Sequence, residues 1–307
     1  VSGIVVAALV AATTFLYLNK SGFKASYLTD KIQGIGIILL LTFLFGIWFS
    51  QNNISEIVDF AILGGLNTFE TYSLKSALAV IIAVTAAEIF STGYWQRTFS
   101  AMNETTIKKA SIYSGFGVFI TILLLGIAGA VGAGKGLEIP TLSFINQLSL
   151  NSMTVLVLIS LATLLVTSSV DTLENAISST ISIDLIKKGS KEANNITLLV
   201  IILALFASTR VTNIFTVFLV ADLLATSLVF PAFYRIKKTS KDILLILPFV
   251  GSLVSVFVYR YLFINLEENP GGLFVPTDLY GLADLNTFAI ALVSSVIITF
   301  VADRFTK

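Results

Sequence analysis

Long apolar runs separated by short charged clusters dominate the sequence. A run of about 20 apolar residues matches the thickness of a bilayer, and a helix satisfies its own backbone hydrogen bonds in lipid. The pattern therefore predicts an all-α, polytopic membrane helix bundle that forms a single transmembrane domain over residues 1–307. The nine predicted spans are Val1–Leu18, Asp30–Phe49, Leu74–Arg97, Ala110–Ala133, Met153–Ile186, Ile196–Ala207, Val211–Tyr234, Ile243–Phe263 and Thr287–Ala302.

Basic residues divide unequally between the alternate loops of this topology. Fifteen lie on one side of the predicted membrane, and four lie on the other: Lys75, Lys135, Arg210 and Arg260. Loops rich in Lys and Arg stay in the cytoplasm. We therefore expect a multi-pass protein of the plasma membrane whose C-terminus is cytoplasmic, with an external loop over Asn265–Asn286.

Composition narrows the classes of function. Hydrophobic residues make up 56% of the chain and charged residues 12%, about half the charged fraction of a soluble domain. Without His or Cys, imidazole metal sites, Ser-His-Asp triads and thiolate nucleophiles are excluded. A net charge of +1 does not indicate nucleic-acid binding. A hydrolase would need an Asp pair or a Ser–Lys dyad at membrane depth. Because no Lys lies in the middle of a predicted span, we predict no enzymatic activity.

A polar stripe runs along the fifth predicted span. Its members recur three or four residues apart: Ser160, Thr163, Thr167, Ser168, Asp171, Asn175, Ser178 and Ser182. Hydroxyls and a carboxylate offer only oxygen ligands, which suit a hard cation such as Na⁺ better than a transition metal. The alternative stays open that the hydroxyls of Ser168 and Ser169 bond to their own or neighbouring helices.

The third predicted span contains a deep acidic residue and a candidate interruption. Glu88 lies within the apolar run, and Ser91-Thr92-Gly93 follows it. Broken helices expose backbone dipoles that bind substrate in transporters. We therefore predict solute contacts from Glu88, Ser91, Thr92 and Tyr94. In the alternative interpretation, the Tyr94–Arg97 end is an interfacial anchor of aromatic and basic residues.

Three motifs in order along the chain carry a family resemblance. Phe23–Gln33 reads FKASYLTDKIQ, Tyr94–Ala101 reads YWQRTFSA, and Ser168–Thr172 reads SSVDT, followed by IDLIK at Ile183–Lys187. In this order and spacing they resemble motifs of the sodium:solute symporter family, which includes sodium-coupled sugar, proline, pantothenate, sialic acid and urea carriers. The resemblance covers essentially the whole chain.

The resemblance implies a fold and a set of sodium ligands. The fold is the five-plus-five inverted-repeat transporter fold, of which this chain would hold core helices four to ten and two more. Because the chain opens inside an apolar run at Val1, we expect further helices to precede it. The implied sodium (Na⁺) ligands are the Leu165 carbonyl and the side chains of Ser168, Ser169, Asp171, Thr172 and Asp30.

The same resemblance implies a function. It is sodium-coupled symport that imports a small polar organic solute by alternating access. Val84 and Ala87 replace the sugar-binding Asn and Tyr of the family, which favours urea, an amino acid or a related solute over a hexose. The alternative is a transporter-like membrane sensor module fused to a signalling kinase.

Overall fold

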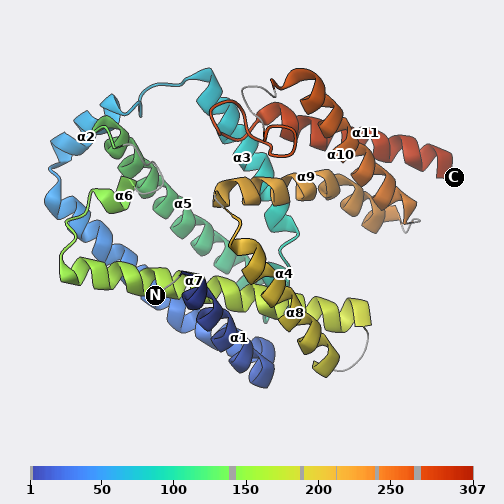
Figure 1. The fold of residues 1–307 in the computed structure, drawn as a ribbon, viewed down its shortest axis with the longest axis horizontal. Helices are drawn as coiled ribbons and strands as arrows, with labels where there is room; N and C mark the ends of the chain where they lie inside the picture. Colours follow the sequence, from blue (N-terminus) through green and yellow to red (C-terminus); the bar gives the residue numbers. More distant parts are fainter. Residues whose placement is uncertain are drawn as a thin grey trace. The chain divides into compact units, whose positions relative to one another are not determined.

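The computed structural model describes residues 3–137, 143–186, 190–211, 213–238, 242–265 and 271–306. Apart from an isolated bridge between Thr277 and Ala283, these residues form helices and turns. The helices group into two compact units (Figure 1). The first unit holds α1 (Gly3–Gln51), α2 (Ile54–Leu63), α4 (Thr92–Phe99), α5 (Glu104–Gly134), α6 (Ser143–Asn146), α7 (Ser152–Thr180), η2 (Ile181–Ile186) and α8 (Ser190–Ser208). The second holds α3 (Thr71–Ile89), α9 (Ile214–Lys238), α10 (Ile243–Phe263) and α11 (Leu285–Thr306).

The all-α, multi-span architecture predicted from the sequence is confirmed. Among the described residues, seven helical segments are long and apolar enough to cross a membrane, and Gly3–Leu18 and Asn194–Ser208 are shorter apolar helices. Together these correspond to the nine predicted spans. The single transmembrane domain, the inverted repeat and the cytoplasmic C-terminus stay predictions. Lys187, Lys188, Lys241 and Lys307, which contribute to the predicted orientation, lie outside the described residues.

The chain reverses direction between the first two predicted spans, but through helical backbone and not through the predicted loop, because α1 is assigned as helix over 49 residues. Tyr17 Oη and Thr29 Oγ1 lie 2.6 and 2.9 Å from the same oxygen of Asp171. A straight helix would separate their Cα atoms by about 18 Å, farther than the two side chains can bridge. The helix therefore turns back on itself between them (Figure 1). Ser26 and Thr29, which precede the predicted start of the second span at Asp30, already lie in this helix and face Asp171 instead of water.

The predicted interruption at Ser91-Thr92-Gly93 is confirmed, although it shortens the third span. Helix α3 ends at Ile89, and the next helix begins at Thr92. Backbone N–H groups of Phe90 and Ser91 close the end of α3 on the carbonyls of Ala87 and Glu88. The predicted Leu74–Arg97 span is thus two helices, which belong to different compact units.

Each unit has its own apolar core. In the first unit the core lies between α1, α2, α5 and α7 around the fully buried Leu44 and Trp48. In the second unit it lies between α3, α9, α10 and α11 around the fully buried Phe288. Many large apolar side chains point outward, such as Ile35 and Ile38 of α1. Such a surface suits lipid rather than water.

Arg260 organises the segment before α11 in the second unit. The guanidinium is fully buried and donates to the carbonyls of Gly272, Val275 and Thr277. It also donates to Thr287 Oγ1 at 2.6 Å and to Asp284 Oδ2 at 3.3 Å. Asp284 in turn accepts from the backbone N–H groups of Asn286 and Thr287, which caps the N-terminus of α11.

Two glycines let α2 and α5 touch backbone to backbone. A Cβ atom at Gly134 would lie 1.9 Å from the carbonyl oxygen of Phe60, and one at Gly64 would lie 1.9 Å from that of Ala130. Gly126, on the same α5 helix, has nothing within 4 Å of its Cβ position.

We expect Gly134→Ala to cost about 1–3 kcal/mol of stability and Gly126→Ala to be neutral or stabilising by up to about 1 kcal/mol. Thermal unfolding in detergent would measure both, and equal effects would contradict the close approach.

Candidate functional site

Asp171, on α7, is fully buried and surrounded by hydroxyl groups. Its Oδ2 accepts from Tyr17 and Thr29, and its Oδ1 accepts from Ser26 Oγ at 3.2 Å and Thr172 Oγ1 at 3.3 Å. A carboxylate offers about four acceptor positions, so these donors occupy it and offset part of the cost of burying it. Each hydroxyl oxygen also carries lone pairs. The same oxygens can therefore be ligands of a cation near Asp171 when their hydrogens turn away.

Asp30, in the part of α1 that follows the reversal, forms an ion pair with Arg97 of α4. The Arg97 guanidinium also donates to Thr172 Oγ1 at 2.9 Å and to the carbonyl of Gly93 at 2.9 Å. Ser168 Oγ donates to the other oxygen of Asp30 at 3.3 Å. Thr172 thus links the Arg97–Asp30 pair to Asp171 in a continuous polar network. We call the residues Tyr17, Ser26, Thr29, Asp30, Arg97, Ser168, Asp171 and Thr172 the carboxylate network.

The predicted sodium ligands divide into two groups. Asp30, Ser168, Asp171 and Thr172 belong to the carboxylate network. Leu165 and Ser169 lie on an exposed side of α7, where Ser169 Oγ donates to the Leu165 carbonyl at 2.9 Å. Ser169 therefore follows the alternative interpretation, in which the hydroxyl bonds to its own helix.

The N-terminal members of the predicted polar stripe form hydrogen bonds within α7 and do not build a site. Ser160, Thr163 and Thr167 donate to backbone carbonyls four residues earlier in α7. Four later members of the stripe reach other helices: Ser168, Asp171, Asn175 and Ser178. Asn175 Nδ2 donates to Gln96 Oε1 at 2.7 Å, and Gln96 Nε2 donates to Ser179 Oγ at 2.5 Å. These amides hold α4 against α7.

The predicted solute contacts are spread over both compact units. Glu88 and Ser91 belong to the second unit, whereas Thr92 and Tyr94 belong to the first. Glu88 is exposed within its unit and lies close enough to the buried Asp222 for repulsion between the two carboxylates. Tyr94 is exposed on α4. A shared binding site for these four residues stays a prediction.

Sequence reasoning missed several partners of the two carboxylates. Arg97 was open to interpretation as an interfacial anchor, yet it pairs with Asp30. Tyr17, Ser26 and Thr29 were not singled out. A signal existed for Ser26 and Thr29, because they stand three residues apart directly before Asp30, a spacing that puts them on one face of a helix. Tyr17 has no such signal, since its contact depends on the reversal of α1.

These features define a multi-pass helical membrane protein with a buried network of charges and hydroxyls. No family model matches the chain, and no solved structure matches it. The chain is similar to the spermidine transporter DUR31 of Candida albicans, with 24% identity over 306 residues that cover 93% of this chain. The match covers 58% of that protein's length. The similarity therefore supports a membrane transporter, and the sodium:solute symporter resemblance stays a prediction.

Proposed function

We propose that this chain forms part of a secondary active transporter that moves a small polar organic solute, coupled to Na⁺. The similarity to a spermidine transporter along 93% of the chain carries the transport assignment. It also makes a polyamine the first solute to test, ahead of urea or an amino acid. The buried carboxylate network supports the coupling, because ionisable groups at membrane depth usually serve ion or substrate pathways.

The carboxylate network suggests how a cation would be bound. Asp30 and Asp171 supply negative charge, while Ser168 and Thr172 supply hydroxyl oxygens between them. Arg97 now neutralises Asp30, so a cation at Asp30 must displace the guanidinium. Na⁺ binding and movement of α4 would then be coupled, as alternating access requires.

The proposal is tested by uptake of labelled spermidine into proteoliposomes that contain the purified protein. We expect accumulation with an inward Na⁺ gradient and little with an equal K⁺ gradient. Urea and proline serve as comparison solutes. Uptake that is equal in both gradients would contradict sodium coupling, and no uptake of any of the three would contradict the solute class.

Asp171→Asn tests the charge of the buried carboxylate. The amide keeps the shape and can still hydrogen-bond the surrounding hydroxyls, so the fold should persist. We expect the Na⁺ concentration for half-maximal uptake to rise about threefold or more, because the site loses a negative ligand. A wild-type Na⁺ activation curve would leave Asp171 a purely structural role.

A further inference from the structure

Glu174 lies one turn after Asp171 on α7 and differs from it in one respect. Its side chain is buried, with 4% of the residue exposed, and neither carboxylate oxygen has a hydrogen-bond partner among the described residues. Thr14 approaches it, but the Thr14 hydroxyl is directed to the carbonyls of Val10 and Ala11. A buried carboxylate without donors costs several kcal/mol. Folding alone therefore does not explain Glu174.

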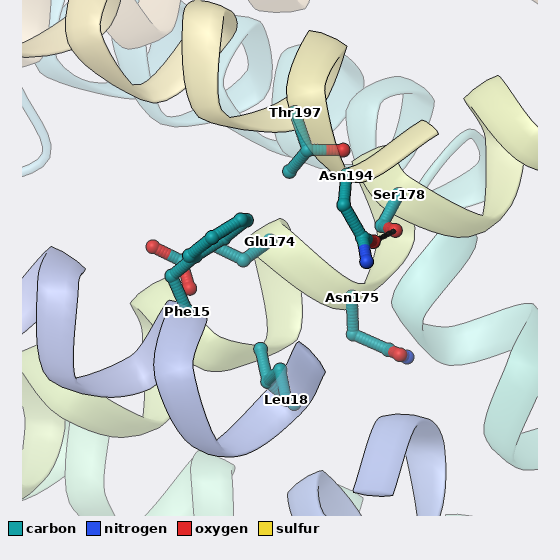
Figure 2. Close-up of a pocket in the computed structure, with 7 residues that line it drawn as sticks. All are labelled: Phe15, Leu18, Glu174, Asn175, Ser178, Asn194 and Thr197. Carbon is teal, nitrogen blue, oxygen red and sulfur yellow. Dashed lines mark hydrogen bonds between the residues drawn. The ribbon is translucent and has the colours of Figure 1, made fainter. Parts of the chain in front are cut away.

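Glu174 lines a small cavity whose walls carry both polar and apolar side chains. Its volume is about 50 Å³, and it lies between α7, α8 and the part of α1 that precedes the reversal. Figure 2 shows the Glu174 carboxylate near Phe15 and turned away from Ser178 and Asn194, which line the other side of the cavity with Thr197. Ser178 Oγ donates to Asn194 Oδ1 at 3.4 Å, so these two groups partner each other.

Glu174 also lines a second, apolar cavity of about 270 Å³ between the same three helices. Val10, Leu173, Ile177 and Ala204 contribute to its walls. Glu174 thus lines both cavities.

We propose that Glu174 binds the primary ammonium group of an alkylamine whose methylene chain lies in the apolar cavity. An ammonium has three donors, enough for the two carboxylate oxygens that lack partners among the described residues. The ring of Phe15 adds an aromatic face, which attracts organic cations. A bare metal ion would instead require oxygen ligands on the side that Phe15 and Leu18 occupy. The inference rests on the proposed function only in taking the solute to be an organic amine.

The test is binding of n-butylammonium to the purified protein in detergent, measured by calorimetry in potassium chloride. Wild-type protein should bind n-butylammonium, and Glu174→Gln should weaken this binding about tenfold. Glu56→Gln, on the exposed surface of α2, is the matched control and should bind as wild type. Phe15→Leu keeps the apolar volume without the ring and should weaken binding by a smaller factor.

Neutral and inorganic probes separate the alternatives. Equal binding of n-butanol would overturn the role of the ammonium. Na⁺ binding that depends on Glu174, in place of amine binding, would overturn the proposal in favour of an inorganic cation. Equal affinity of wild type and Glu174→Gln for n-butylammonium would also overturn it.

Thermal stability without ligand distinguishes a binding role from a structural one. Because Gln is neutral, Glu174→Gln should melt at the same temperature as the wild type or higher, although its amine affinity falls. A lower melting temperature would overturn the proposal. Spermidine uptake then separates the site from the proposed function. If the wild type and Glu174→Gln take up spermidine equally well, only the site is contradicted. If amine binding depends on Glu174 but no spermidine is taken up, only the proposed function is contradicted.

Discussion

Replacing Arg260 with methionine should cost about 3–5 kcal/mol of stability, the range for removing one partner of a buried ion pair. The variant leaves Asp284 without its guanidinium. It also removes the Arg260 donors from the buried carbonyls of Gly272 and Thr277, whereas the Val275 carbonyl keeps the Thr277 N–H as a donor. Thermal unfolding in detergent micelles, followed by circular dichroism, measures the loss.

Two further variants show whether stability depends on the planar guanidinium of Arg260, with its several donors, or only on its positive charge. Arg260→Lys keeps the charge but has three donors on a single nitrogen, so it should recover only part of the stability. Arg304→Met removes a guanidinium from an exposed position in the last turn of α11 and should change stability by less than about 0.5 kcal/mol. An Arg260→Met protein as stable as Arg304→Met would show that the segment folds without this anchor.

Opposite shifts in Na⁺ dependence should result from removing either partner of the Arg97–Asp30 pair. Arg97→Gln frees the Asp30 carboxylate, so the Na⁺ concentration for half-maximal uptake should fall about tenfold, which corresponds to about 1.4 kcal/mol. Asp30→Asn removes the charge that attracts the cation, so this concentration should rise about tenfold. Both variants should lower the maximal rate, because the exchange between guanidinium and cation is lost.

Arg235→Gln is the matched control, since Arg235 forms an ion pair with Asp242 at an exposed position. Surface pairs of this kind contribute little, and Na⁺ activation should stay as in the wild type. Shifts in the same direction for Arg97→Gln and Asp30→Asn would show that the pair supports the fold and does not compete with Na⁺.

The positions of the helices were predictable because lipid imposes a simple requirement. Every span must be apolar over about 20 residues and must satisfy its own backbone. The predicted Ile243–Phe263 span agrees with α10 residue for residue, and the break after Ile89 followed from Ser91-Thr92-Gly93. The loop predicted after Leu18 failed because polarity was taken as exposure to water. Ser26, Thr29 and Asp30 are polar because they face Asp171 and Arg97.

The functional residues were predictable only as chemical types. Asp171 stood out because a carboxylate in an apolar run is costly and needs a reason. The same argument applied to Glu174, which the sequence shows one turn later, but nothing local distinguishes a carboxylate with four donors from one with none. That difference arises where α1 and α8 pack against α7.

By itself, the sequence determined that this is a helical, multi-span chain with carboxylates at membrane depth, since hydropathy and periodicity are local properties. The tertiary structure decided the partners: Tyr17 and Thr29 on one oxygen of Asp171, Arg97 on Asp30, and none of the described residues on Glu174. The physical reason is that hydrogen bonds and ion pairs act over about 3 Å. Which side chains come that close depends on the reversal of α1 and the packing of α4 and α8, and residues far apart in sequence determine both.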